Sequence, residues 1–135
     1  MKSSLAAVLE ELRAAEKAQA MFYRRLAAMA EAAGAEAFAQ RLHDLHADEQ
    51  HHLSRLTARL VELGCSPADL SGVSSVQADL TGWEAVARER EGVEVMRYEE
   101  LLHGDLDPET RALAEAIVAV ERMHRSLLEG KWTMA

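Results

Sequence analysis

Apolar side chains recur every three or four residues through most of the chain, a spacing typical of amphipathic α-helices. The pattern predicts four helices, at about residues 4–33, 35–63, 82–102 and 108–129. Leu42, Leu45 and Leu56 mark the apolar stripe of the second helix, but two steps of the same stripe are Glu49 and His52. A carboxylate and an imidazole on a buried face cost several kcal/mol unless something compensates both. The stripe therefore predicts a buried partner for these two side chains.

Glycine, proline and aspartate indicate where the helices end and how they connect. Gly34 separates the first two helices, and so short a turn makes them an antiparallel hairpin. Residues 64–81 are rich in Ser, Gly and Asp and form a far longer connection than a hairpin requires. Because a nearly extended chain spans about 3.3 Å per residue, this crossover can leave the second and third helices parallel. Thr81 with Glu84 is expected to cap the third helix, and Asp107 the fourth.

The polar steps of the four stripes repeat along the chain. The first and third helices share the pattern Glu-x6-Tyr, and the second and fourth share Glu-x2-His. The matched pairs are Glu16/Tyr23 with Glu91/Tyr98 at a shift of 75 residues, and Glu49/His52 with Glu121/His124 at a shift of 72. In each helix the polar step lies near the middle of the stripe. Four packed helices would therefore place these carboxylates and imidazoles at one depth in the bundle.

Short motifs also arise by chance, and one Glu-x2-His pair shows how an irrelevant match looks. Three such pairs occur in the chain, whereas composition alone predicts about one. The third is Glu100/His103. Glu100 lies about 200° round the helix from Tyr98, and His103 stands at the predicted helix end. We therefore expect Glu100 and His103 at the surface, and we expect His46 and His51 to be solvated as well.

The spacing of the other two pairs is typical of metal ligands. Residues i and i+3 of a helix lie on one face, so the Glu and His of each pair can reach one ion. Carboxylate oxygens with one imidazole per ion suit iron or manganese, whereas thiolates would indicate zinc or iron–sulfur. Two divalent ions would bring four or five carboxylates close to neutrality, which would compensate their burial. The expected cofactor is two iron ions, with manganese or a mixed pair as the alternatives.

The order of these residues resembles that of a known family. The pattern E…ExxH…E…ExxH is formed by Glu16, Glu49, His52, Glu91, Glu121 and His124. It is similar to the ligand pattern of the ferritin-like di-iron superfamily and covers nearly the whole chain. The resemblance implies a single all-α domain over residues 1–135, a ferritin-like four-helix bundle with a long crossover between helices two and three. The roles it implies are two bridging carboxylates, Glu49 and Glu121, with Glu16 and His52 completing one ion and Glu91 and His124 the other.

Within that superfamily the chain is most similar to rubrerythrin-type bundles. Rubrerythrins carry an additional carboxylate on helix three that is linked to their use of peroxide. Glu94 stands at that spacing, where the first repeat has Gln19, and is a seventh candidate metal ligand, with an ordinary surface glutamate as the alternative. Tyr23 and Tyr98 are candidate catalytic residues that would hydrogen-bond the ligating carboxylates; core aromatics with a hydroxyl partner are the alternative. The 135 residues have neither the length nor the cysteines for the rubredoxin domain usual in rubrerythrins, so we expect that a reductase would need a separate electron donor.

Composition and charge exclude several other classes of protein. The formal net charge of −8 over 135 residues disfavours nucleic acid or an anionic membrane surface as a partner. Cys65 is the only cysteine, so disulfides within the chain and CxxC metal sites are excluded. The apolar run over residues 5–9 is too short for a signal peptide, and no segment approaches the roughly 20 apolar residues of a membrane span. We therefore expect a cytoplasmic protein.

These observations favour a di-iron redox protein that reacts with peroxide or dioxygen, as a peroxidase or a ferroxidase. The alternatives are an iron-storage protein of the ferritin type, a di-iron hydroxylase of an organic substrate, and a metal-free helical interaction module. Leu53, Leu60 and Val61 lie beside the main stripe of the second helix and predict a second buried face, as in a homodimer. The expected partners are a small oxidant, a separate electron donor and a second copy of the chain.

Overall fold

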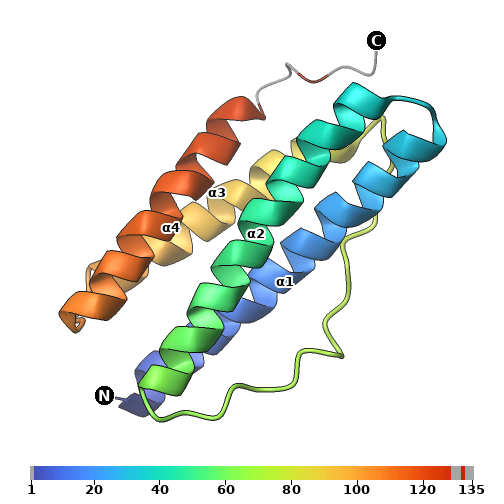
Figure 1. Cartoon of the computed structure of the whole chain (residues 1–135). Coiled ribbons are helices and arrows are strands. Elements are labelled where there is room, and N and C mark those ends of the chain that lie inside the picture. The colour runs from blue at the N-terminus through green and yellow to red at the C-terminus, as the bar shows by residue number, and fades with distance from the viewer. Residues whose placement is uncertain (1, 129–131, 133–135) are drawn as a thin grey trace.

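The described part of the chain contains four α-helices. The computed structural model describes residues 2–128 and 132. The helices are α1 (Lys2–Ala32), α2 (Glu36–Glu62), α3 (Trp83–Leu102) and α4 (Pro108–Leu127). They pack as a bundle (Figure 1), which confirms the predicted all-α four-helix architecture. The predicted end of the fourth helix, at Glu129, lies outside the described residues. Among those residues, no helix combines the length and the apolar character that a membrane crossing requires.

Two helical hairpins form the bundle, and one long segment joins them. Most interhelical contacts lie within the pairs α1/α2 and α3/α4. Gly34 and Gly64 follow the ends of α1 and α2 and adopt φ angles of +76° and +83°, the left-handed conformation that glycine adopts without strain. Residues 63–82 then run along the outside of the bundle from the end of α2 to the start of α3, so α2 and α3 are parallel, as predicted (Figure 1).

The start of α3 differs from the sequence prediction. Gly82 is the N-cap residue, and no side chain caps the helix there, so the predicted capping role of Thr81 is wrong. Asp79 Oδ1 accepts hydrogen bonds from the backbone nitrogens of Thr81 and Gly82, both at 3.0 Å, and from the Thr81 hydroxyl at 2.7 Å. The Thr81 hydroxyl therefore belongs to the preceding turn. Asp107 does cap α4, because its side chain accepts a hydrogen bond from Thr110 N at 3.0 Å.

The core consists of two apolar clusters with a polar layer between them. One cluster, around Phe22, Leu42 and Trp83, fills the end of the bundle where α1 ends and α2 begins. The other, around Leu12, Leu56 and Ile117, fills the opposite end. Because α1, α2 and α3 contribute to both clusters, and α4 is held by the second cluster and by Leu128 directly after its end, the polar middle of every apolar stripe lies at the same depth. The buried polar residues of this layer include Glu16, Glu49, His52, Glu91, Glu121 and His124.

The apolar residues beside the main stripe of α2 do not all face outward. Leu60 is fully buried and packs inside the second cluster, so it is not part of a second face. Leu53 is half-buried, and Val61 is 58% exposed. The homodimer therefore remains a prediction that rests on Leu53 and Val61.

Candidate metal centre

Six ligand-type side chains from all four helices meet in the middle of the bundle. Each is between 0% and 2% exposed. They are Glu16 from α1, Glu49 and His52 from α2, Glu91 from α3, and Glu121 and His124 from α4. The helices bring them together because apolar turns on both sides of each residue pack into the two clusters, so the polar turn has no route to the surface. The six residues that the repeat singled out thus lie within one buried layer.

The six residues form two overlapping sets. Within each set, one ligand atom per residue lies within 4.8 Å of the ligand atoms of the other three. The sets are Glu16, Glu49, His52 and Glu121, and Glu49, Glu91, Glu121 and His124. Carboxylates and imidazoles bind metals such as zinc at about 2.0–2.2 Å, so opposite ligands of one ion are about 4 Å apart. Each set therefore has the dimensions of a metal site, and Glu49 and Glu121 belong to both.

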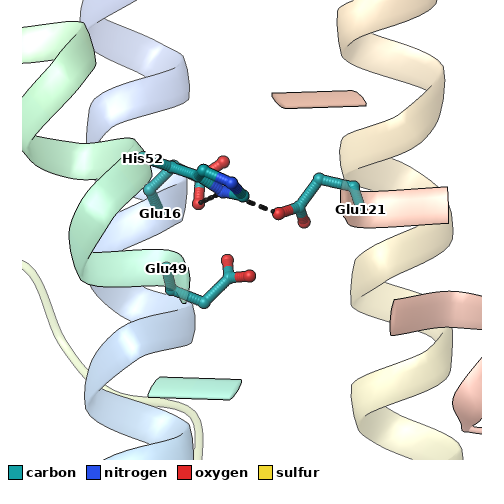
Figure 2. A group of neighbouring side chains, drawn as sticks. All are labelled: Glu16, Glu49, His52 and Glu121. Atoms are coloured by element: carbon teal, nitrogen blue, oxygen red, sulfur yellow. Dashed lines mark hydrogen bonds and ion pairs between the residues drawn. The ribbon is translucent and has the colours of Figure 1, made fainter. Parts of the chain in front are cut away.

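His52 joins the two hairpins. Its Nδ1 lies 3.3 Å from Glu16 Oε1 and 2.9 Å from Glu121 Oε1. Figure 2 shows Glu16, Glu49 and His52 on one hairpin, with Glu121 pointing toward them from the other. The imidazole thus faces a carboxylate of α4 as well as one of α1. A cation placed among these atoms would contact ligands from both halves of the repeat.

His124 makes the corresponding contacts and one more. Its Nδ1 lies 3.1 Å from Glu49 Oε1 and 3.4 Å from Glu91 Oε2. Its Nε2 lies 2.8 Å from Asp48 Oδ2, a contact that the sequence did not predict. Burial would lower the pKa of His124, but the carboxylates of Glu91 and Asp48 outweigh burial and raise it. The one sequence signal for this contact is that Asp48 directly precedes Glu49.

Two buried tyrosines hold the outer carboxylates. The Tyr98 hydroxyl donates to Glu16 Oε2 at 2.7 Å, and the Tyr23 hydroxyl donates to Glu91 Oε2 at 2.6 Å. Each tyrosine therefore bonds the glutamate of the other repeat. Burial and the adjacent carboxylates raise the pKa of both phenols well above the usual value, so both stay protonated as donors. The expected hydrogen bonds to Glu16 and Glu91 are present, and the catalytic role of the tyrosines remains a prediction.

Gln19 and Arg90 extend this network on one side of the centre. Gln19 Nε2 donates to the Tyr23 hydroxyl oxygen at 3.0 Å and lies 3.4 Å from Glu91 Oε2. Arg90 Nε donates to Gln19 Oε1 at 2.8 Å, which fixes the orientation of the amide. Arg90 was not predicted, because nothing in the apolar stripe of α3 indicates that its side chain reaches α1. The result is a chain of donors that ends at Glu91.

The middle of the centre has more acceptors than donors. Both oxygens of Glu49 and of Glu121, Glu91 Oε1 and His124 Nδ1 are buried without a hydrogen-bond partner. Burial, followed by the neighbouring carboxylates, raises the pKa of Glu49 and of Glu121 well above the usual value. Proteins rarely leave so many buried polar atoms unpaired. Oxygen atoms and Nδ1 lone pairs aimed at a common space are what divalent cations bind, so these groups could hold metal ions.

Glu94 is the predicted ligand that the structure leaves outside both sets. The residue is buried, with 5% exposure, and its Oε2 has no hydrogen-bond partner. Burial, together with the nearby Glu16 carboxylate, raises the pKa of Glu94 to about 8. The residue lines a groove of about 770 Å³ between α1 and α3. The groove is lined by Glu11, Ala14, Ala15, Val86, Glu89, Arg90, Val93, Glu94 and Arg97.

The remaining histidines and the third Glu-x2-His pair lie away from the centre. Glu100 and His103 are both exposed, as predicted. His51 is exposed, and His46 is half-buried. None of these residues belongs to either ligand set. Position on the apolar stripe therefore separates the two central pairs from the peripheral one.

Comparison with known proteins adds no family to these observations. No protein-family model matches the chain, and no curated protein matches it. The geometry and chemistry of the buried centre are therefore the basis for a functional proposal.

Proposed function

We propose that this protein is a di-iron carboxylate redox protein that reacts with peroxide or dioxygen, of the rubrerythrin type within the ferritin-like superfamily. The observation that carries the proposal is the pair of overlapping ligand sets that share Glu49 and Glu121. Two bridging carboxylates with one imidazole and one further carboxylate per ion form the ligand set of di-iron four-helix bundles. Such a set favours iron or manganese over metals that prefer thiolates.

The charge of the centre fits two divalent ions. The four carboxylates of the two sets carry four negative charges when ionised, and two divalent ions carry four positive ones. The neutral assembly would offset the burial that raises the pKa of Glu49 and Glu121 in the metal-free chain. Iron, when bound, supplies the electrons that peroxide or dioxygen accepts. The residues of the chain hold those ions and keep the centre out of bulk water.

The surrounding residues orient the ligands. Tyr98 and Tyr23 each donate to one carboxylate oxygen, which fixes the rotamers of Glu16 and Glu91 before any ion arrives. The groove between α1 and α3 supports access of a small oxidant from that side. Glu94 lines this groove and is the most exposed of the seven predicted ligands, so an oxidant entering there would meet Glu94 first.

Anaerobic titration with Fe(II) tests the metal centre itself. We expect two ions per chain, and loss of both in Glu49→Ala, because Glu49 belongs to both ligand sets. The matched control is Glu100→Ala, which removes a glutamate of the same motif from the surface and should leave both ions bound. A wild-type protein that binds no iron, or a Glu49→Ala variant that binds as much as the wild type, would overturn the proposal.

Stopped-flow mixing of the iron-loaded protein with hydrogen peroxide or with dioxygen tests the reaction. We expect Fe(II) to be oxidised at least about tenfold faster with the wild-type protein than with an equal concentration of the Glu49→Ala variant. The faster of the two oxidants identifies the physiological class. Oxidation at equal rates in the two samples would show that the bound iron is not a redox centre.

A further inference from the structure

The two imidazoles of the centre are supported differently. Nδ1 of His124 faces Glu49 and Glu91, and Nε2 on the opposite side of the ring lies 2.8 Å from Asp48 Oδ2. Asp48 is on α2, directly before Glu49, and its side chain is 47% exposed. It belongs to neither ligand set. The ring of His124 is therefore held between the centre and a carboxylate at the surface.

The internal repeat places no carboxylate at the corresponding position behind His52. The shift of 72 residues that matches Glu49 with Glu121 and His52 with His124 matches Asp48 with Val120. A valine side chain accepts no hydrogen bond. All six ligand-type residues and both tyrosines are repeated, but the carboxylate behind His124 occurs once. The pseudo-symmetry of the centre is broken at this position.

A carboxylate behind a metal-binding histidine has a known physical effect. A hydrogen bond from Nε2–H to the carboxylate fixes the tautomer, so the Nδ1 lone pair points toward the metal, and it increases the basicity of the imidazole. Removal of such a partner costs about 10- to 100-fold in metal affinity. Because Val120 cannot provide this hydrogen bond, His52 lacks the equivalent contribution from that position.

We propose that Asp48 is a positioning residue that makes the two metal subsites inequivalent, so that the subsite of Glu91 and His124 fills first and holds its ion more tightly. This inference rests on the proposed di-metal function. Through Asp48, a partly exposed side chain sets the order in which the chain loads its two ions. The subsite of Glu16 and His52 fills second.

Anaerobic calorimetry with Mn(II), which binds without being oxidised during the titration, tests the order of loading. The wild type should bind two ions in two separate steps. In Asp48→Ala the tighter step should weaken by about 10- to 100-fold and merge with the second. The matched control is Asp44→Ala, which removes the same charge one turn earlier on α2, where the aspartate accepts a hydrogen bond from Gln40 and not from His124.

The repeat also supplies the converse variant. Val120→Asp places a carboxylate at the position that corresponds to Asp48, so the weaker step should become tighter. Nitrogen-15 NMR of the histidine rings in the metal-free protein gives a second measurement, in which Asp48→Ala should change the Nε2–H signal of His124 and leave that of His52 unchanged.

The outcomes separate this inference from the function on which it rests. A wild type that binds no metal would overturn both. A wild type that binds two ions in equal steps, or equal effects of Asp48→Ala and Asp44→Ala, would overturn the role of Asp48 and leave the di-metal centre standing. An NMR spectrum in which Asp48→Ala leaves the His124 ring unchanged would also overturn that role.

Discussion

Glu49 and Glu121 are fully buried, and neither oxygen of either carboxylate has a hydrogen-bond partner. Side chains in this state lower the stability of a metal-free bundle, because a buried carboxylate loses its hydration without gaining a donor. A protein selected for stability alone would place leucine there. The proposed metal ions would offset this cost by supplying positive charge to both carboxylates.

Replacement of a glutamate that belongs to both ligand sets should therefore increase the stability of the metal-free protein and abolish metal binding. We expect Glu49→Leu to raise the free energy of unfolding of the metal-free protein by about 1–2 kcal/mol, because an apolar side chain fills the same space without a charge to bury. The same variant should lose the stabilisation that Mn(II) gives the wild type. Urea unfolding with and without Mn(II) measures both effects. A metal-free Glu49→Leu protein that is less stable than the wild type would contradict the expectation.

The pKa values of the buried carboxylates predict how stability depends on pH. The folded protein raises the pKa of Glu49 and Glu121 well above the usual value and that of Glu94 to about 8. Between the ordinary pKa of glutamate and these raised values, the folded metal-free protein keeps protons that the unfolded chain has released. The contribution of these groups to stability is therefore greatest below about pH 4.5 and decreases toward pH 8. The slope is up to about 1.4 kcal/mol per pH unit for each group.

Urea midpoints between pH 5 and pH 8 measure this slope. Glu94→Gln should flatten it, because the amide does not titrate. Bound Mn(II) should remove the part of the slope that comes from Glu49 and Glu121, because the ions keep both carboxylates ionised in the folded protein, as they are in the unfolded chain. A metal-free protein whose stability rises over this range would show that the carboxylates are ionised in the folded chain.

The buried centre shows which functional residues can be predicted from the sequence. Glu16, Glu49 and their counterparts in the repeat were identified because each occupies an apolar stripe, where a polar residue is conspicuous. Asp48 and Arg90 were not, because both lie beside the stripe and bond to residues on other helices. Periodicity specifies which face of a helix is buried. It does not specify how two helices are rotated against each other, and contacts such as Asp48–His124 depend on that rotation.

At the scale of the elements, Arg59 ties the end of α2 to the start of α4. Its guanidinium contacts Asp107 at 2.7 Å and Glu109 at 3.0 Å, and its Nε donates to Thr110 Oγ1 at 2.9 Å. Asp107 is also the cap of α4, so one buried arginine holds the cap and the first turn in place. The interaction lies about two turns from His52, away from the centre.

Arg59→Met should lower the free energy of unfolding by about 1–3 kcal/mol, because the hydrogen bonds of a nearly buried charge are lost while the aliphatic packing is kept. Metal affinity should not change. The matched control is Arg122→Met, which removes an exposed ion pair with Glu99 and should cost less than about 1 kcal/mol. Equal effects in the two variants, measured by urea unfolding, would show that Arg59 does not join the helices.

Some helix boundaries were predicted correctly from the sequence, and one was not. The short turn at Gly34 and the cap at Asp107 were correct, because each depends on residues that are neighbours in the chain. The cap at Thr81 was wrong, because the Thr81 hydroxyl donates to Asp79 Oδ1 in the preceding turn and does not cap α3. Where two local motifs compete for one hydroxyl, the spacing of residues does not decide between them.

At the scale of the whole molecule, the assembly state separates the remaining alternatives. Val61 is exposed and Leu53 half-buried on the outer side of α2. We expect light scattering to give twice the mass of one chain, and Val61→Lys to shift the protein toward the monomer, because burial of a lysine in an apolar interface is unfavourable. A mass near that of a 24-subunit particle would favour iron storage instead. A wild-type monomer would contradict the homodimer prediction.

The segment over residues 63–82 joins two hairpins that each contribute half of the centre, and it runs outside the bundle (Figure 1). Glu16, Glu49 and His52 come from the first half, and Glu91, Glu121 and His124 from the second. If the chain is divided within this segment, each of the two peptides carries half of the ligands. The two peptides should therefore reassemble when Mn(II) is added. Such complementation is expected of a chain that arose by fusion of two copies of one helix pair. In that case the two copies would once have formed the centre as a symmetric dimer, and the connecting segment would now join them covalently.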